Sequence, residues 1–373
     1  MNILVTGGAG FIGSFLTDSL IKKGHKVRIY DNLEYQVHQG KIPEYLNKKA
    51  EFIRADITNA SLLDKALQDI DIVFHEAAMV GVGQSMYQIG KYTRINTYGT
   101  GLLLDLIINK HKKHIKKLII AASMSEYGEG LYRCDNCGDI KPDLRSEQQL
   151  QKKTWELVCP NCRSVLRPKA TSEKTPLITS SIYALNKRDQ EEMVMMIGKA
   201  FKIPSVALRY FNVYGPRQSL ANPYTGVAAI FISRIKANKP PVINEDGNQS
   251  RDFVSVHDIV SANIAVMKNP KADYQIFNVG SGDKITILKL SQLLIKLQSG
   301  NNSGLLPLIR NEFRKGDIRH CFADITKINR TIGWQPKMNF EKGLDELIRW
   351  SKTAYSEDLF DKAQSILQKK GVI

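Results

Sequence analysis

Short apolar runs alternate with stretches of helical periodicity along the first half of the chain. The apolar runs have the length of buried strands and cover residues 3–5, 26–31, 51–57, 71–78 and 117–123. The helical stretches between them cover residues 11–20, 61–68 and 93–109. This alternation predicts an α/β fold with a Rossmann-type doubly wound parallel sheet. Ligands of such sheets bind beyond the carboxyl ends of the strands.

The alternation weakens in the second half of the chain. A helical pattern covers residues 181–200, and residues 204–216 form a further buried strand that ends in a turn. Residues 251–282 contain segments that are typical of a return to the first lobe. Two amphipathic patterns, at 285–297 and 340–351, then predict helices of a smaller, discontinuous α+β lobe.

A glycine-rich turn joins the first predicted strand to the first predicted helix. Gly7, Gly10 and Gly13 let backbone NH groups approach a pyrophosphate at the positive end of that helix. Asp31 ends the second predicted strand, where an acid binds the ribose hydroxyls of NAD and disfavours the extra phosphate of NADP. Plain strand–helix packing is the alternative for the turn, and an ordinary turn acid is the alternative for Asp31.

The composition is that of an ordinary globular protein, with 43% hydrophobic and 24% charged residues. A chain of 373 residues predicts two lobes around one cleft. No apolar run reaches the length of a membrane span, and the chain enters a strand without the features of a signal peptide. We therefore expect a cytoplasmic protein without a membrane partner.

The net charge of +16 favours an anionic ligand, either nucleic acid or a small anionic substrate. The densest basic run, at residues 110–117, follows an apolar helical pattern and complements the negative end of that helix. It lacks the interleaved aromatic residues of a surface that binds single strands. A small anionic substrate is therefore favoured over nucleic acid.

Four cysteines form two CxxC pairs with 21 residues between them: Cys134, Cys137, Cys159 and Cys162. Two such short loops can bring four thiolates to one tetrahedral zinc ion. Because all four ligands are thiolates, the pattern predicts a structural zinc in a zinc-ribbon-like insertion. Disulfides are the alternative, which a cytoplasmic location disfavours. The polar stretch at 146–155 is expected to be a small outlying excursion, and Cys321 an ordinary buried residue.

Tyr183 and Lys187 lie four residues apart at the start of a helical pattern, so they share one helical face. A nearby ammonium and the positive nicotinamide ring of NAD favour phenolate, which predicts a lowered pKa of Tyr183. Ser123 ends a predicted strand at the same edge of the sheet. A surface tyrosine packed on a lysine stem is the alternative.

The ordered motifs resemble those of the extended short-chain dehydrogenase/reductase family, best known for nucleotide-sugar epimerases and dehydratases. The resemblance rests on TGGAGFIG at 6–13, Asp31, Asp56-Ile57, HEAA at 75–78, NTYGT at 96–100, Ser123, Tyr183xxxLys187 and RYFN at 209–212. It implies a catalytic triad of Ser123, Tyr183 and Lys187 beside a tightly held NAD.

The same resemblance implies two sets of ligand contacts. The implied cofactor contacts are Gly7, Gly10, Phe11, Ile12, Gly13, Asp31, Asn32, Asp56, Ile57, Ala77, Ala78, Asn96, Tyr183 and Lys187. The implied contacts of a nucleotide-sugar substrate are Ser123, Ser125, Asn212, Arg251, Arg314 and Asp317. The two arginines also suit a diphosphate chemically, because guanidinium groups bind phosphate oxygens in pairs.

The residues after Ser123 separate the reactions of this family. Its 4,6-dehydratases carry Asp-Glu there, whereas this chain has Met124 and Ser125, which cannot shuttle protons as carboxylic acids do. Glu126 comes one place too late, and in a strand-like run its side chain points to the other face. The resemblance therefore implies 4-epimerisation through transient oxidation at C4 and return of the hydride to the opposite face.

The segments at 30–38, 81–86 and 123–132, together with the paired CxxC motifs, are similar to bacterial dTDP-L-rhamnose 4-epimerases. Those enzymes interconvert dTDP-L-rhamnose and dTDP-6-deoxy-L-talose. A UDP-glucose or UDP-N-acetylglucosamine 4-epimerase is the alternative, and a 4,6-dehydratase is less favoured. An NAD-binding sensor or scaffold, with a cysteine module that contacts nucleic acid, is a different class. It predicts a degraded catalytic set, whereas Ser123, Tyr183 and Lys187 are all present.

The resemblance also implies a division of the chain into domains. An NAD-binding domain takes residues 1–128 and 176–212, and the cysteine insertion takes 129–175. Residues 213–373 form mainly the nucleotide-sugar lobe, with about 251–282 returning to the NAD domain. We expect the insertion to be a zinc-held flap beside the sugar pocket. The helical stretches around 102–108 and 193–197 are consistent with the dimer seam common in this family.

Overall fold

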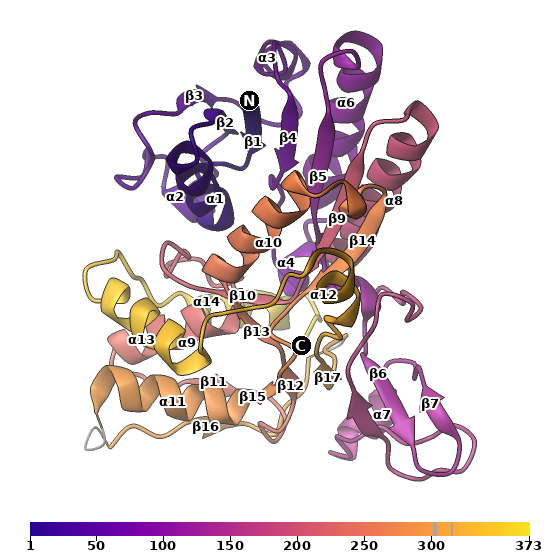
Figure 1. Cartoon of the computed structure of the whole chain (residues 1–373). Coiled ribbons are helices and arrows are strands. Elements are labelled where there is room, and N and C mark those ends of the chain that lie inside the picture. The colour runs from indigo at the N-terminus through magenta and orange to yellow at the C-terminus, as the bar shows by residue number, and fades with distance from the viewer. Residues whose placement is uncertain (301–303, 315) are drawn as a thin grey trace.

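The protein, in a computed structural model that covers residues 1–300, 304–314 and 316–373, is built around a seven-stranded sheet (Figure 1). Every strand pair in this sheet is parallel. In spatial order the strands are β14 (Gln275–Val279), β9 (Ser205–Tyr210), β5 (Lys117–Ser123), β4 (Ile72–His75), β1 (Asn2–Thr6), β2 (Lys26–Asp31) and β3 (Glu51–Arg54). The predicted Rossmann-type sheet is confirmed.

Successive side chains of the strands bury themselves against helices on opposite faces of the sheet. Ile3 and Val5 join one core cluster, whereas Leu4 between them joins another. The first face is covered by α1 (Phe11–Lys22) and α10 (Val256–Lys268), and the second by α3 (Ala60–Ala66), α6 (Gly99–Leu106) and α8 (Ile182–Phe201). Strands buried on both faces explain why the runs are continuously apolar.

Two of the predicted strands are shorter than their apolar runs. β3 ends at Arg54 and β4 ends at His75, and the chain then turns along the carboxyl edge of the sheet. The predicted helix at 93–109 lies within a longer helical segment with two π-helical stretches. This segment contains α5 (Ile89–Thr93), η1 (Arg94–Tyr98), α6 and η2 (Ile107–His111). Two further short helices of the first lobe are α2 (Tyr35–His38), after β2, and α4 (Val82–Ser85), after β4. Among the described residues no helix is both long enough and apolar enough to cross a bilayer.

A second lobe lies at the carboxyl edge of the sheet (Figure 1). Its core joins the apolar faces of α9 (Val227–Lys236), α11 (Ile287–Ser299) and α13 (Phe340–Ser351). Its strands are β10 (Asn212–Tyr214), β11 (Val242–Ile243), β12 (Ser250–Arg251), β13 (Phe253–Ser255), β15 (Ile285–Thr286), β16 (Leu308–Ile309) and β17 (His320–Cys321). The helix α14 (Phe360–Lys369) also belongs to this lobe, whereas η4 (Pro270–Ala272) and α12 (Thr326–Ile332) pack on the core of the sheet beside α10 and β14.

The cysteine insertion folds into a small unit of its own beside the second lobe (Figure 1). It holds the antiparallel strands β6 (Leu131–Cys134), β7 (Gly138–Ile140) and β8 (Arg167–Lys169) and the helix α7 (Glu147–Gln151). Tyr132, Leu157 and Leu166 pack with two of the cysteines in its core. Most of the stretch at 146–155 is exposed, as expected of a polar excursion, although Trp155 at its end is buried and the preceding Arg145 is buried against the second lobe.

Candidate active site

One cavity of about 620 Å³ lies between the carboxyl edge of the sheet and the second lobe. Most of the predicted cofactor and substrate residues line it, although they come from strands and loops that are far apart in the sequence. They are Gly7, Gly10, Phe11, Ile12, Gly13, Asp31, Asn32, Ile57, Ala77, Ala78, Ser123, Ser125, Tyr183, Lys187, Asn212, Arg251, Arg314 and Asp317. The structure therefore brings the two predicted sets together in one continuous space.

Asp56 and Asn96 are the two predicted cofactor residues that lie behind the cavity wall. The carboxylate of Asp56 accepts a hydrogen bond from Nδ2 of Asn32 at 2.9 Å, and Asn32 lines the cavity. The amide of Asn96 binds the backbone NH and carbonyl of Met79, at 2.8 and 3.1 Å. Both side chains therefore hold wall segments in place.

The glycine turn is packed too tightly to accept side chains. Gly7 has a φ of +70°, in the left-handed region that favours glycine. A Cβ on Gly13 would lie 2.2 Å from the carbonyl oxygen of Gly7, and one on Gly7 would lie 2.8 Å from the NH nitrogen of Ala77. The turn opens directly into α1, so the NH groups at the helix start face the cavity edge, a geometry that suits a pyrophosphate.

Asp31 is held rigidly at the end of β2. One oxygen of its carboxylate accepts a hydrogen bond from the NH of Ala9 at 3.1 Å, and the other accepts one from the NH of Leu33 at 2.8 Å. The carboxylate lines the cavity on the glycine-turn side. Its fixed position fits the ribose hydroxyls of a dinucleotide whose pyrophosphate lies on the turn.

The predicted triad meets where α8 packs on β5. Ser181 caps the start of α8 by accepting a hydrogen bond from the NH of Ala184 at 3.1 Å, which places Tyr183 in the first turn of the helix. One turn later, the ammonium of Lys187 donates to the carbonyl oxygen of Ala121 at 2.7 Å. Ser123 ends the same strand, and its hydroxyl acts to lower the pKa of Tyr183. All three triad side chains line the cavity.

The sequence predicts a lowered pKa of Tyr183 beside both Lys187 and the nicotinamide ring of NAD, whereas the pKa of Tyr183 in the protein without NAD is raised. Burial raises the pKa of Tyr183 to about 12, and the Ser123 hydroxyl opposes this only in part. Burial also lowers the pKa of Lys187 to about 8. Removal from water disfavours the charged form of each of these side chains, and the nearby Glu126 raises the pKa of Tyr183 further.

Residues 124–127 form the 3-10 helix η3, not the strand-like run expected from the sequence. The side chain of Glu126 turns back to accept a hydrogen bond from the NH of Ser123 at 2.8 Å, and it lies 3.7 Å from the guanidinium of Arg209. Met124 and Ser125 line the cavity, whereas Glu126 does not. The nearest acid after Ser123 thus caps a helix instead of facing the substrate space.

A half-buried acid, which the sequence analysis names only as part of the HEAA motif, lines the cavity near Lys187. Glu76 accepts a hydrogen bond from the hydroxyl of Tyr210 at 2.9 Å, and that hydroxyl in turn accepts one from Asn263 at 2.7 Å. Burial raises the pKa of Glu76 to about 7, against the opposing effects of Tyr210 and Lys187. An acid in the otherwise apolar run after β4 was the sequence signal that could have identified it.

The wall opposite the glycine turn carries the predicted diphosphate contacts. Arg251 donates to the carbonyl oxygens of Ile318 at 2.7 Å and of Arg319 at 3.0 Å. Arg314 forms an ion pair with Asp317 at 2.6 Å. The Oδ1 atom of Asn212 is buried in this cavity without a hydrogen-bond partner among the described residues. A ligand that donates a hydrogen bond would satisfy it.

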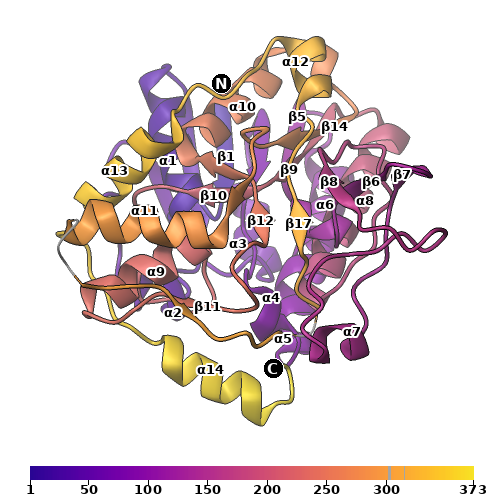
Figure 2. The same cartoon turned by 90° about the horizontal axis from the view of Figure 1, so that it is seen from below.

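The helix α14, which the sequence analysis did not predict, closes part of the cavity. Phe360, Ala363 and Leu367 face inward at helical spacing, together with Gln364. Figure 2 shows α14 at the edge of the second lobe, and Asp361 ties it to Arg234 of α9 at 3.1 Å. The spacing of its apolar residues is amphipathic, so the pattern was present in the sequence.

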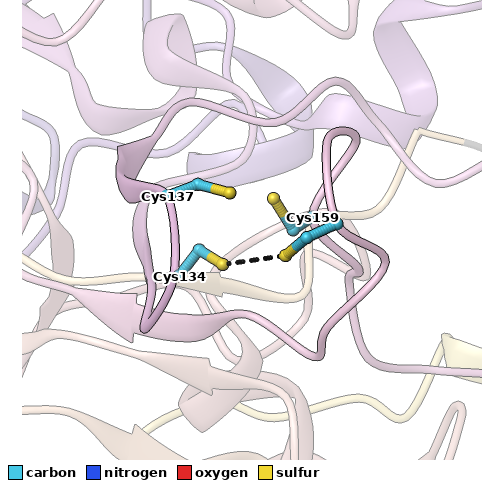
Figure 3. Close-up of side chains that lie close together, drawn as sticks. Cys134, Cys137 and Cys159 are labelled. Carbon is cyan, nitrogen blue, oxygen red and sulfur yellow. Dashed lines mark hydrogen bonds between the residues drawn. The ribbon is translucent and has the colours of Figure 1, made fainter.

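The four predicted zinc ligands come together in the insertion. Their sulfur atoms lie within 4.8 Å of one another, and those of Cys134 and Cys162 are 3.4 Å apart. Figure 3 shows the sulfurs of Cys134, Cys137 and Cys159 pointing toward a common centre. All four thiols are free of disulfides. Four thiolates at such separations can surround one tetrahedral ion. Cys321 is buried elsewhere, as expected.

Comparison with known proteins agrees with this geometry. The model of the NAD dependent epimerase/dehydratase family matches residues 3–280. The dTDP-L-rhamnose 4-epimerase of Burkholderia thailandensis is 33% identical, over 93% of this chain and 94% of that protein. The UDP-glucose 4-epimerase of Thermotoga maritima, solved with UDP-glucose, superposes with a TM-score of 0.77 at 31% identity, over 94% of this chain and 99% of the other.

A second solved structure carries both a cofactor and a substrate. The UDP-glucuronic acid 4-epimerase of Bacillus cereus, in complex with UDP-glucuronic acid and NAD, superposes with a TM-score of 0.77 at 30% identity. The superposition covers 95% of this chain and 100% of that one. The likeness therefore includes both the sheet and the second lobe.

Proposed function

The chain belongs to the NAD dependent epimerase/dehydratase family, and on this premise we propose that it is a nucleotide-sugar 4-epimerase that works with bound NAD. One observation carries the proposal. Ser123, Tyr183 and Lys187 converge in a cavity with the glycine turn on one side and Arg251 and Arg314 on the other. A dinucleotide and a nucleotide sugar can thus meet at the triad.

The glycine turn and Asp31 would hold NAD, which would supply the group that takes up the hydride of the sugar C4 and gives it back. The Tyr183 hydroxyl, as phenolate, takes the proton of the C4 hydroxyl, and Ser123 holds the same oxygen by a hydrogen bond. Lys187 keeps Tyr183 in position through its bond to Ala121. The 4-keto sugar turns over within the cavity, and Tyr183 then gives the proton back to the oxygen on the other face.

The proposal favours epimerisation over dehydration because of the two residues next to Ser123. A 4,6-dehydration needs an acid and a base beside the sugar, and the cavity presents Met124 and Ser125 at those positions. Glu126 is occupied with the backbone NH of Ser123 and with Arg209. A dehydratase yields an absorbing 4-keto-6-deoxy sugar that is lighter by one water, whereas an epimerase yields only an isomer.

For the substrate we propose dTDP-L-rhamnose, with dTDP-6-deoxy-L-talose as product. The sequence relative from Burkholderia thailandensis supports this choice. The second candidate is a UDP-sugar 4-epimerase, which the structural likeness to the Thermotoga maritima enzyme supports. Incubation of the NAD-loaded protein with a panel of dTDP- and UDP-sugars, followed by NMR, decides between them. Isomers from the UDP-sugars alone would reject the dTDP assignment, and no isomer from any of them would reject the function.

We further propose that the four cysteines hold one structural zinc ion. The support is the cluster of four free sulfurs on two hairpin-like loops, with an apolar core behind them. Four protein thiolates leave no open position for water, which suits a structural ion. Metal analysis of the purified protein tests this directly, and a metal-free protein with an intact fold would reject it.

Finally, we propose a homodimer formed through α8, which contains the predicted stretch 193–197, and the neighbouring η1. The other predicted stretch, at 102–108, is mostly buried in this chain's own core and leaves little apolar surface for a partner. Leu185 and Met196 are 42% and 67% exposed, and eleven residues of helix put them on one face. Tyr98 is 55% exposed, and Thr97 beside it donates to Asp189 of α8 at 3.0 Å. Replacing Met196 by Glu should shift the mass measured by light scattering to that of a monomer. A monomeric wild type would reject the proposal.

A further inference from the structure

One arginine of the cysteine insertion reaches the wall of the cavity. Arg145 lies between the two CxxC pairs, and its side chain is 1% exposed. Its Nη2 atom donates to Oε1 of Glu245 at 2.8 Å and to the carbonyl oxygen of Asp317 at 3.0 Å. Its Nη1 atom donates to the carbonyl oxygen of Trp155 at 3.2 Å, within the insertion itself. Glu245 and Asp317 both line the cavity.

Glu245 adopts a backbone conformation that needs outside support. Its φ of +53° lies in the left-handed region, which residues with a side chain rarely occupy. The second oxygen of its carboxylate accepts a hydrogen bond from Arg319 at 2.9 Å. Two arginines thus neutralise and fix this buried acid, and one of them belongs to the insertion. A side chain so fully paired has little freedom to rotate.

The segments that Arg145 joins are those that hold the predicted diphosphate ligands. Asp317 binds the guanidinium of Arg314, and the following carbonyl, of Ile318, accepts from Arg251 at 2.7 Å. Glu245 belongs to the loop that leads from β11 to β12, and Arg251 lies on β12. Arg145 is therefore a clamp between the loop that leads into β12, which carries Arg251, and the segment that carries Arg314 and Asp317.

We infer that Arg145 is a positioning residue for the nucleotide-sugar diphosphate, through which the four-cysteine insertion controls substrate binding. The inference rests on the proposed function, since it assigns the Arg251–Arg314 wall to a nucleoside diphosphate. The inference concerns only the nucleotide-sugar half of the cavity. The glycine turn and Asp31 in the other half have no hydrogen bond to Arg145, so we expect NAD binding to be independent of Arg145.

Three variants test the inference. Arg145→Ala removes the clamp and leaves Glu245 buried with one fewer partner. Arg145→Lys keeps the charge, but its point-like ammonium cannot reproduce the planar fork that serves Glu245, Asp317 and Trp155 together. Arg133→Ala is the matched control, because Arg133 lies on β6 of the same insertion and its side chain is 60% exposed, paired only with Asp139.

The probes are dTDP and UDP, titrated by calorimetry into each NAD-loaded protein, with the affinity for NAD measured separately. We expect Arg145→Ala to lower the affinity for whichever of dTDP and UDP the wild type binds better, by about 10- to 100-fold. The KM should rise by a similar factor, and kcat should change little. Arg145→Lys should fall in between. The NAD affinity of both variants and every property of Arg133→Ala should match the wild type.

The result that overturns the inference is unchanged nucleotide affinity and KM in Arg145→Ala while the wild type binds the nucleotide. If neither dTDP nor UDP binds the wild type, the proposed function itself fails. If the circular dichroism spectrum and the NAD affinity of Arg145→Ala show that this variant does not fold, Arg145→Lys is the deciding variant. Wild-type nucleotide affinity in Arg145→Lys would then reject the clamp.

Discussion

The ammonium of Lys187 on α8 lies 2.7 Å from the carbonyl oxygen of Ala121, two residues before Ser123 on β5. This bond joins the helix that carries Tyr183 to the strand that carries Ser123. Because Tyr183 precedes Lys187 by one helical turn, the bond also fixes the tyrosine hydroxyl at the end of β5. The geometry of the proposed triad thus comes from packing between a helix and a strand.

Replacing Tyr183 by Phe should lower kcat by at least about 10²- to 10⁴-fold, because the variant lacks the group that moves the C4 proton. The ring and its packing remain, so NAD should stay bound at wild-type affinity. Turnover and the NAD content of the purified variant are the two measurements. Tyr355→Phe is the control, since that tyrosine is 62% exposed and outside the cavity lining. Turnover close to wild type in Tyr183→Phe would remove Tyr183 from this role.

Replacing Gly13 by Ala should abolish or strongly weaken NAD binding. The added Cβ would lie 2.2 Å from the carbonyl oxygen of Gly7 and 2.7 Å from the Cα of Gly8, and neither backbone atom can move without opening the turn. Gly90→Ala is the control, because an added Cβ there meets no atom within 4 Å and Ala favours the helix. Fluorescence titration measures the NAD affinity of the two variants. Equal affinities of Gly13→Ala and Gly90→Ala would contradict the proposal that the glycine turn binds NAD.

The raised pKa of Glu76 predicts that the stability of the folded protein depends on pH. Its pKa is about 7 in the folded protein because of burial, above the ordinary value of 4.5, so the folded state keeps a proton that the unfolded state loses. Stability therefore falls as the pH rises from about 4.5 to 7, by at most about 3 kcal/mol, since cavity water screens the charge.

Glu76→Gln should remove this dependence, because Gln mimics the protonated acid. Relative to the wild type, the variant should gain thermal stability between pH 5 and pH 8. Melting curves of both proteins across that range measure the difference. A difference that is constant with pH, or that shrinks as the pH rises, would contradict the raised pKa.

Loss of Cys134 and Cys137 should release the proposed zinc. Two thiolates cannot hold the ion at a four-thiolate site, so Cys134→Ser with Cys137→Ser should reduce zinc from about one ion per chain to a trace. If the insertion acts through Arg145, the same variant should also weaken dTDP or UDP binding. Adding Arg145→Ala to it should then have little further effect. Zinc analysis and calorimetry are the measurements, with Cys321→Ser as control.

An unchanged zinc content in the double variant would contradict the metal site. Zinc loss with unchanged nucleotide affinity would support the metal site but reject its effect on nucleotide binding. The zinc would then stabilise only the insertion.

Sequence reasoning was strongest where local periodicity and chemistry agree. Continuous apolar runs such as residues 117–123 required a strand covered on both faces, and the structure has β5 over Lys117–Ser123. The glycine spacing, the Tyr183–Lys187 spacing and the CxxC pairs each fix a local geometry. The shared edge of a parallel sheet then brings the first two together.

Features that depend on distant partners could not be predicted from the sequence. Arg145 and Glu245 are 100 positions apart in a polar context, so no periodicity links them. The pKa of Tyr183 depends on how fully the neighbouring segments bury it, which spacing does not reveal. Residues 124–127 are a different case, because the S-x-x-E spacing of Ser123 and Glu126 is the sequence signature of the reciprocal cap that the structure shows, and the strand prediction overlooked it.

The central claim is that the sugar C4 gives up a hydride inside this cavity and receives the same one back. A dTDP-L-rhamnose deuterated at C4, incubated with the NAD-loaded protein in ordinary water, tests it most directly, with UDP-glucose deuterated at C4 in parallel. NMR and mass spectrometry should show an isomer with all its deuterium still at C4. An isomer with hydrogen from water at C4, or no isomer from either sugar nucleotide, would contradict the claim.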